Sequence, residues 1–121
     1  MNSESAEFIE KLLRLMPELI PVYEEQIAFW LPDEPQDTTV LGRLGQGIAS
    51  TFDCFAHDTV AQCFHMIESV VARPIDDRLS TVVATGLLEG LSAGMRRRSG
   101  LWDRVVPLLG PASRHHIESW R

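Results

Sequence analysis

Apolar residues recur every three or four positions along nearly the whole chain, which is the spacing of one face of an α-helix. Strand signals are nearly absent, since the β-branched run 81–83 lies inside a longer helical pattern. The first predicted helix begins at about Ser3, its expected N-cap, and ends at Pro17. Its apolar side consists of Phe8, Ile9, Leu12, Leu13 and Met16.

A second helix is expected to start near Pro21, because proline is tolerated only in the first turn of a helix. Four apolar side chains, spaced four, four and three residues apart, form its predicted buried stripe: Leu19, Tyr23, Ile27 and Trp30. Residues 31–37 follow as a loop, since two prolines and three acidic residues do not continue a helix.

Three more helices are predicted, each starting at a polar capping residue. The expected caps are Asp37 or Thr38 for the third helix, Asp58 for the fourth, and Asp76 or Asp77 for the fifth. The predicted buried positions are Leu41, Leu44, Gly45, Ile48, Phe52 and Phe55 in the third helix, Val60, Phe64, Ile67 and Val71 in the fourth, and Leu79, Val82, Val83, Leu87 and Leu91 in the fifth. Because Arg73 and Pro74 break the chain between them, the fourth and fifth helices are expected to form an antiparallel hairpin.

The C-terminal part continues the same pattern. Ser99 and Gly100 end the fifth helix, and a last short helix after Pro111 holds Ile117 and Trp120. The apolar residues between them are Leu101, Trp102, Val105, Val106, Leu108 and Leu109. The chain therefore predicts an all-α fold, with residues 1–121 as a single helical domain. We expect six to seven short helices as antiparallel helical hairpins, in a bundle or a short helical-repeat-like stack.

The composition is that of an ordinary folded domain, with 45% apolar and 23% charged residues. The acidic residues 1–7 lack the basic start and apolar run of a secretory signal, and the weakly polar stretch 80–95 is too short to span a bilayer. Two cysteines, Cys54 and Cys63, do not indicate a disulfide framework. We therefore expect a cytoplasmic protein with reduced thiols and no membrane association.

The distribution of charge says more than the net charge of −6. Residues 1–77 carry 14 acidic and 4 basic side chains, a balance of −10, whereas residues 78–121 carry 3 acidic and 7 basic ones, a balance of +4. No Lys or Arg lies between Arg14 and Arg43. A field of this sign repels nucleic acid and attracts basic partners, so we expect a protein partner and no nucleic acid.

The most acidic stretch is the candidate site. Carboxylates grouped without counter-charges repel one another, and a basic partner relieves that repulsion. An aromatic residue beside them is a suitable anchor, because interface energy concentrates in such side chains. The predicted partner-binding residues are Glu24, Glu25, Trp30, Asp33, Glu34 and Asp37, with Phe29 nearby. The alternative is a solvated helix face followed by a solvated loop.

Cys54, His57, Cys63 and His65 are four potential metal ligands within twelve residues. Their spacing matches no common zinc pattern, and on a helix the side chains of Cys63 and His65 point in different directions. A Cys–His nucleophile would need a third, orienting group, and the sequence suggests none. We therefore predict no metal, no cofactor and no catalytic residue.

Glycines concentrate in two segments. Residues 41–47 lack the Lys-Ser/Thr of a phosphate-binding loop, so their glycines indicate close approach of a neighbouring helix. Gly86, Gly90 and Gly94 share one side of the fifth helix, where they favour core packing or, alternatively, a self-association face. Residues 96–98, three arginines, lie at the end of that helix, where positive charge suits the helix dipole.

Three segments resemble a family of small bacterial domains of uncharacterised function. They are Leu12-Leu-Arg-Leu-Met-Pro-Glu-Leu19, Thr85-Gly-Leu-Leu-Glu-Gly-Leu91 and Leu108-Leu-Gly-Pro-Ala-Ser-Arg114. The resemblance covers nearly the whole chain. It implies an all-helical fold and a likeness to immunity proteins of polymorphic toxin systems, and it supplies no catalytic residues.

The favoured functional hypothesis is an immunity-type inhibitor, not an enzyme, that docks its acidic surface on a basic toxin domain. The first alternative is a homo-oligomeric adaptor, for example a homodimer, that uses the glycine-rich face of the fifth helix. The second is a small metal-dependent enzyme.

Overall fold

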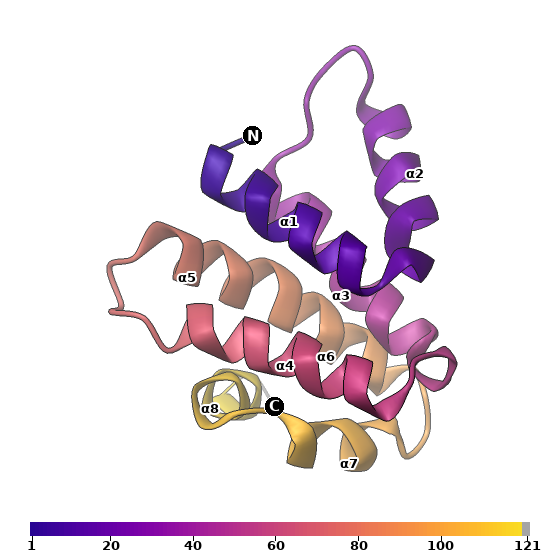
Figure 1. The fold of residues 1–121 in the computed structure, drawn as a ribbon, viewed down its shortest axis with the longest axis vertical. Helices are drawn as coiled ribbons and strands as arrows, with labels where there is room; N and C mark the ends of the chain where they lie inside the picture. The colour runs from indigo at the N-terminus through magenta and orange to yellow at the C-terminus, as the bar shows by residue number, and fades with distance from the viewer. Residues whose placement is uncertain (120–121) are drawn as a thin grey trace.

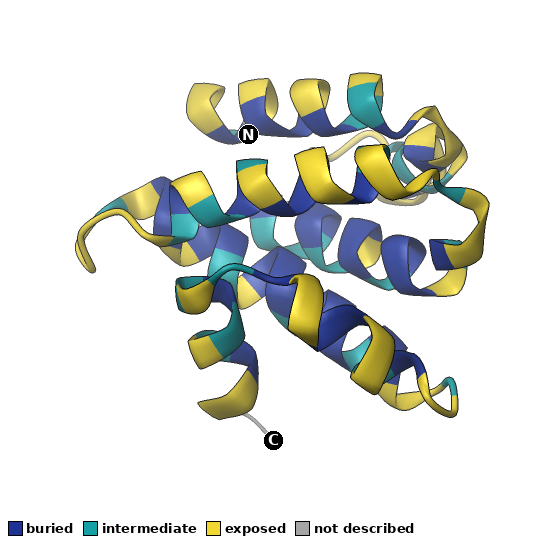
Figure 2. Ribbon diagram, turned by 60° about the horizontal axis from the view of Figure 1, so that its bottom comes forward, coloured by how far each residue is buried: buried dark blue, intermediate teal, exposed yellow. Residues whose placement is uncertain are grey.

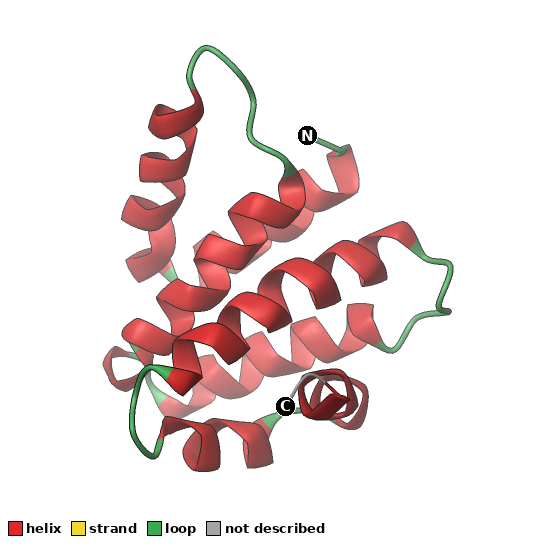
Figure 3. Ribbon diagram, turned by 180° about the vertical axis from the view of Figure 1, so that it is seen from behind, coloured by secondary structure: helices red, strands yellow, loops and turns green. Residues whose placement is uncertain are grey.

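The structure, a computed structural model, describes residues 1–119. These residues form helices joined by loops, without a strand, as Figure 3 shows, so the predicted all-α fold is confirmed for this part of the chain. Trp120, which was expected in the last helix, lies outside the described residues.

The helices follow the predicted order along the chain. They are α1 (Ser3–Leu15), α2 (Ile20–Trp30), α3 (Asp37–Ser50), α4 (His57–Val71), α5 (Arg78–Val82), α6 (Glu89–Arg96), α7 (Leu101–Val105) and α8 (Pro111–Ser119). Short 3₁₀ turns are η1 (Pro17–Leu19), η2 (Phe52–Cys54) and η4 (Val106–Leu108), and η3 (Val83–Leu88) is a π-helical turn. Because η3 joins α5 directly to α6, residues 78–96 form the one long fifth helix that the sequence predicts.

The helix caps are only partly as predicted. The Asp77 side chain caps α5, accepting a hydrogen bond from the Ser80 N–H at 2.9 Å, as expected. Asn2, not Ser3, caps α1, because the Asn2 side chain accepts from the Glu4 N–H at 2.9 Å. The prediction of Asp58 as the cap of the fourth helix was wrong, since α4 already begins at His57 with Ala56 as its N-cap.

The centre of the molecule is the crossing of α3 with η3 and α6. Glycines on both helices make this approach possible: a Cβ atom added to Gly90 would lie 2.1 Å from the backbone oxygen of Gly42, and one added to Gly45 would lie 2.2 Å from that of Leu87. Any larger residue at Gly45 or Gly90 would force the two backbones apart. The predicted role of these glycines in close helix packing is therefore confirmed.

The self-association face proposed for the fifth helix was wrong. Gly86, Gly90 and Gly94 are all buried against α3, where added Cβ atoms would meet Thr38, Gly42 and Ala49 respectively. This side of the helix is therefore not available to a second copy of the chain.

The remaining helices surround this crossing. Figure 1 shows α4 running beside α5, and the contacts of α4 with α5 and η3 confirm the predicted hairpin. Because α3 contacts α1, α2, α5, η3 and α6, the arrangement is a bundle and not a stack in which each unit meets only its neighbours. Most helices turn a buried side inward and an exposed side outward, as Figure 2 shows.

Glu68 on α4 attaches the last helix. Its carboxylate accepts hydrogen bonds from the backbone N–H groups of Ala112 and Ser113 at 3.0 and 2.9 Å, and from the Ser113 hydroxyl at 2.8 Å. Burial raises the pKa of Glu68, but these hydrogen bonds outweigh it and hold the pKa below its ordinary value. The carboxylate thereby satisfies N–H groups that have no partner within α8.

A helix can cross a bilayer only where it is long enough and apolar enough. Over residues 1–119, each helix is too short or too polar to cross a bilayer.

The central crossing makes a direct prediction about stability. The substitution Gly90→Ala should lower the free energy of unfolding by about 2 kcal/mol or more. The clash of the new Cβ with the Gly42 oxygen costs more than the gain of about 1 kcal/mol from the higher helix propensity of alanine. Urea unfolding followed by circular dichroism measures this change.

Gly42→Ala is the matched control on the facing helix. Its Cβ would meet only the Gly86 oxygen, at an ordinary 3.7 Å, so the variant should be as stable as the natural protein or slightly more stable. Equal stability of the two variants would show that α3 and α6 are farther apart at Gly90 than the structure has them.

Candidate functional site

Helix α2 is the least covered long helix of the bundle. Gln26 is its only buried residue, although the helix is rich in apolar side chains. Leu19 and Val22 lie near Gly47 of α3, where an added Cβ would come within 3.1 and 3.5 Å of their side chains. The inner side of the segment is therefore formed by Leu19, Val22 and Gln26.

The predicted buried stripe of the second helix was only partly right. Leu19 is buried as expected, but Tyr23 and Ile27 are half-buried and Trp30 is 39% exposed. The reason is that α2 packs mainly against a single long helix, α3, which is too narrow to cover apolar residues on two sides.

Exposed apolar side chains gather at the end of α2. Of the six large apolar side chains that are exposed within residues 1–119, four lie in residues 20–31. Phe29 is 74% exposed and Leu31 66% exposed. The rings of Phe29 and Trp30 meet edge to face with centroids 5.5 Å apart, so the two aromatic side chains form one apolar projection. It lies where the long loop to α3 begins (Figure 1).

Acidic residues lie on both sides of this projection along the chain. Glu24 and Asp33 are exposed and form no ion pair with any residue of the described part of the chain. Glu25 forms a loose ion pair with Arg43, at 3.9 Å, and remains largely exposed. Glu34 contacts the amino group of Met1. We call the exposed residues of this region the α2 surface: Glu24, Glu25, Phe29, Trp30, Leu31, Asp33 and Glu34.

Asp37 was wrongly included in the predicted docking site. It is 8% exposed, and its carboxylate accepts hydrogen bonds from the Ser5 hydroxyl at 2.9 Å and from Arg78 at 3.0 Å. Burial raises the pKa of Asp37, but the hydrogen bonds from Ser5, Arg78 and the Thr38 N–H outweigh it and hold the pKa below its ordinary value of 3.8. Asp37 therefore joins α1, α3 and α5 and is not free to meet a partner.

Phe29 and Leu31 are the residues of this surface that the sequence interpretation did not select. A single amphipathic stripe leaves the opposite side of a helix polar, whereas residues 20–31 are apolar on several sides. That excess of apolar residues was the available signal, and it predicts that some of them stay exposed.

The four candidate metal ligands are not brought together. Cys54 is exposed in η2, Cys63 is buried in α4, and His57 and His65 are exposed. Burial raises the pKa of the Cys63 thiol to about 12, so this side chain is protonated at neutral pH. Within residues 1–119, no three His, Cys, Asp or Glu side chains are grouped closely enough to hold a metal ion.

The three arginines at the end of α6 have different surroundings. Arg96 lies 5.9 Å from the centre of the Trp102 ring. Arg98 donates to the Ala49 backbone oxygen and to Asp53, both at 2.6 Å. Arg97 is exposed. The end of the helix is thus positive, as predicted, but its charges are divided among separate contacts.

Comparison with protein families places the chain in one of them. A family model described as "Domain of unknown function (DUF7674)" matches residues 9–121, which extends from within α1 to the end of the chain. No curated protein and no solved structure matches the chain.

The position of Asp37 predicts a pH-dependent loss of stability. At neutral pH, Asp37→Asn should lower the free energy of unfolding by about 1–3 kcal/mol, because charge-assisted hydrogen bonds to Ser5 and Arg78 are weakened. Since the pKa of Asp37 is lowered in the folded state, its contribution is complete above 3.8 and is lost as the pH falls through the lower, folded value. Unfolding titrations of both proteins across this range measure the difference.

Asp33→Asn is the control, because it removes an exposed, unpaired carboxylate from the same segment. Its stability should match that of the natural protein at every pH. If Asp37→Asn behaves like Asp33→Asn, the assignment of Asp37 to the buried network fails.

Proposed function

The chain belongs to the family described as a domain of unknown function (DUF7674), and from its α2 surface we propose that it is a protein-binding module. The module docks this surface on a basic partner protein. Following the likeness to immunity proteins, we propose further that docking neutralises a toxin domain.

The observation that carries this proposal is the apolar projection of Phe29, Trp30 and Leu31. A folded chain gains free energy by burying such side chains, and here the bundle leaves Phe29 and Leu31 mostly in water. Aromatic residues in this position are typical anchors of protein interfaces, where they fill a pocket on the partner. The rest of the contact area then serves to exclude water from the anchor.

The exposed acids specify the chemistry of the partner. Glu24 and Asp33 have no counter-charge in the described part of the chain, so a basic rim around the partner's apolar pocket would complement them. A second copy of this chain would instead bring two sets of carboxylates together, and their repulsion opposes self-association through the same surface. We therefore favour a different, positively charged protein. A toxin that acts on an anionic substrate would present such a surface.

The first experiment compares binding by variants. The tagged chain captures proteins from its native host, and the affinity of each purified candidate is then measured for the natural protein and for Phe29→Ser. Loss of an interface anchor typically weakens binding by about 2 kcal/mol or more, so affinity should fall at least about thirtyfold. Ile75→Ser is the matched control, because Ile75 is 96% exposed but lies in the loop before α5. Its affinity should be unchanged.

Electrostatic steering provides the second measurement. Association with the partner should slow as the salt concentration is raised. The double variant Glu24→Gln/Asp33→Asn should associate more slowly than the natural protein, and its association rate should depend less on salt. The partner should also be toxic when expressed alone and harmless when expressed with the natural chain.

Two results would contradict the proposal. One is equal binding by the Phe29→Ser and Ile75→Ser variants, which would place the interface elsewhere. The other is a concentration-dependent dimer in sedimentation that Phe29→Ser abolishes, which would assign the α2 surface to a second copy of the chain.

A further inference from the structure

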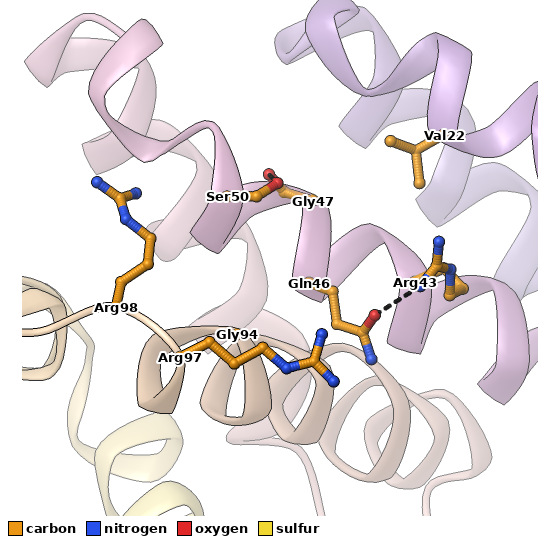
Figure 4. Close-up of a pocket in the computed structure, with 8 residues that line it drawn as sticks. All are labelled: Val22, Arg43, Gln46, Gly47, Ser50, Gly94, Arg97 and Arg98. Carbon is orange, nitrogen blue, oxygen red and sulfur yellow. Dashed lines mark hydrogen bonds between the residues drawn. The ribbon is translucent and has the colours of Figure 1, made fainter.

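A small cavity lies between α2, α3 and the C-terminal end of α6. Its volume is about 240 Å³, and it is lined by Val22 of α2, by residues of α3 and by the end of α6. Figure 4 shows Arg43 and Gln46 on one side and Arg97 extending toward them from the other. Positive side chains thus gather at this cavity although the chain as a whole carries a net charge of −6.

Hydrogen bonding leaves several donors of this cavity unused. Arg43 donates to the Gln46 side-chain oxygen at 2.8 Å, which fixes the Gln46 amide with its NH₂ group as a remaining donor. The guanidinium group of Arg97 forms no hydrogen bond or ion pair with any residue in the range 1–119, and only the Arg97 backbone N–H is bonded, to the Gly94 oxygen. Among the residues that the structure describes, the only carboxylate paired with Arg43 is that of Glu25, at a loose 3.9 Å.

Arg98, which also borders the cavity, has a different role. Both of its terminal nitrogens are already bonded, to the Ala49 oxygen and to Asp53. In Figure 4 its side chain points away from Gln46 and Arg43. Arg98 therefore holds the end of α6 against α3 and leaves Arg97 to face the cavity.

From these observations we infer that the cavity binds a phosphate group. The guanidinium groups of Arg43 and Arg97 come from two different helices, and the Gln46 NH₂ group adds a third set of donors. The oxygens of a tetrahedral phosphate point in several directions and can accept from all three donor groups. A planar carboxylate has only two oxygens, which lie in one plane. Binding would also relieve the repulsion between the two arginines.

The other walls indicate the form of the ligand. Gly47 and Gly94 line the cavity without side chains, and Val22 provides an apolar wall. The volume is below that of pockets for drug-sized ligands, which begin at about 300 Å³. The site therefore fits inorganic phosphate or a phosphomonoester with a small substituent. This inference does not depend on the proposed docking function.

The test is a titration followed by NMR at low ionic strength, with inorganic phosphate as one probe and glycerol phosphate as the other. Saturable shifts are expected in the amide signals of Gly47 and Gly94 and in the side-chain NH signals of Arg43 and Arg97. Arg97→Gln and Arg43→Gln should each weaken binding at least about tenfold, while urea unfolding confirms that both variants remain folded.

Arg96→Gln is the matched control. It removes the same charge one residue away, from a side chain that lies against Trp102 and not at this cavity. Phosphate affinity should remain within about twofold of that of the natural protein. Tighter binding of glycerol phosphate than of inorganic phosphate would identify a phosphomonoester as the ligand, and equal binding would identify phosphate itself.

Two outcomes would overturn the inference. One is the absence of saturable shifts with both probes at millimolar concentration. The other is equal weakening by Arg96→Gln and Arg97→Gln, which would reveal only a general attraction of anions to the end of α6. Neither outcome bears on the α2 surface, because Phe29 and Leu31 do not line the cavity.

Discussion

The approach of α3 to α6 through facing glycines is the constraint on which the rest of the structure depends. At Gly45 and Gly90 the two backbones are so close that even one added Cβ would not fit. Such contact brings the apolar residues beside the glycines into the same core, which offsets the low helix propensity of glycine. Helices α1, α4, α7 and α8 then complete the cover of this central pair.

The same constraint explains why both candidate sites lie near α2. With one side of α3 occupied by α6, α2 packs along the flank near Gly47 and leaves Phe29 and Leu31 exposed. The cavity beside Arg97 forms at this boundary, where Gly47 and Gly94 contribute no side chains to fill it. The packing of the core thus determines where the surface is apolar and where it is hollow.

Local signals in the sequence predicted the helices well, because an apolar period of three to four residues and a cap such as Asp77 act within one or two turns. Contacts between distant segments were harder to predict. Nothing within the acidic stretch indicates that Asp37 is buried with Ser5 and Arg78, which are far away in the sequence. In the same way, Arg43 and Arg97 are far apart in the sequence but line one cavity, because the facing glycines bring α3 and the end of α6 together.

Native-state amide hydrogen exchange tests the central role of this crossing most directly, because it measures the free energy of opening at each backbone N–H. If the α3–α6 pair holds the fold together, the amides in the middle of these two helices exchange only when the whole chain unfolds, and those of α2 exchange through a less costly local opening. Slow exchange of α2 together with early opening of α3 or α6 would contradict the account.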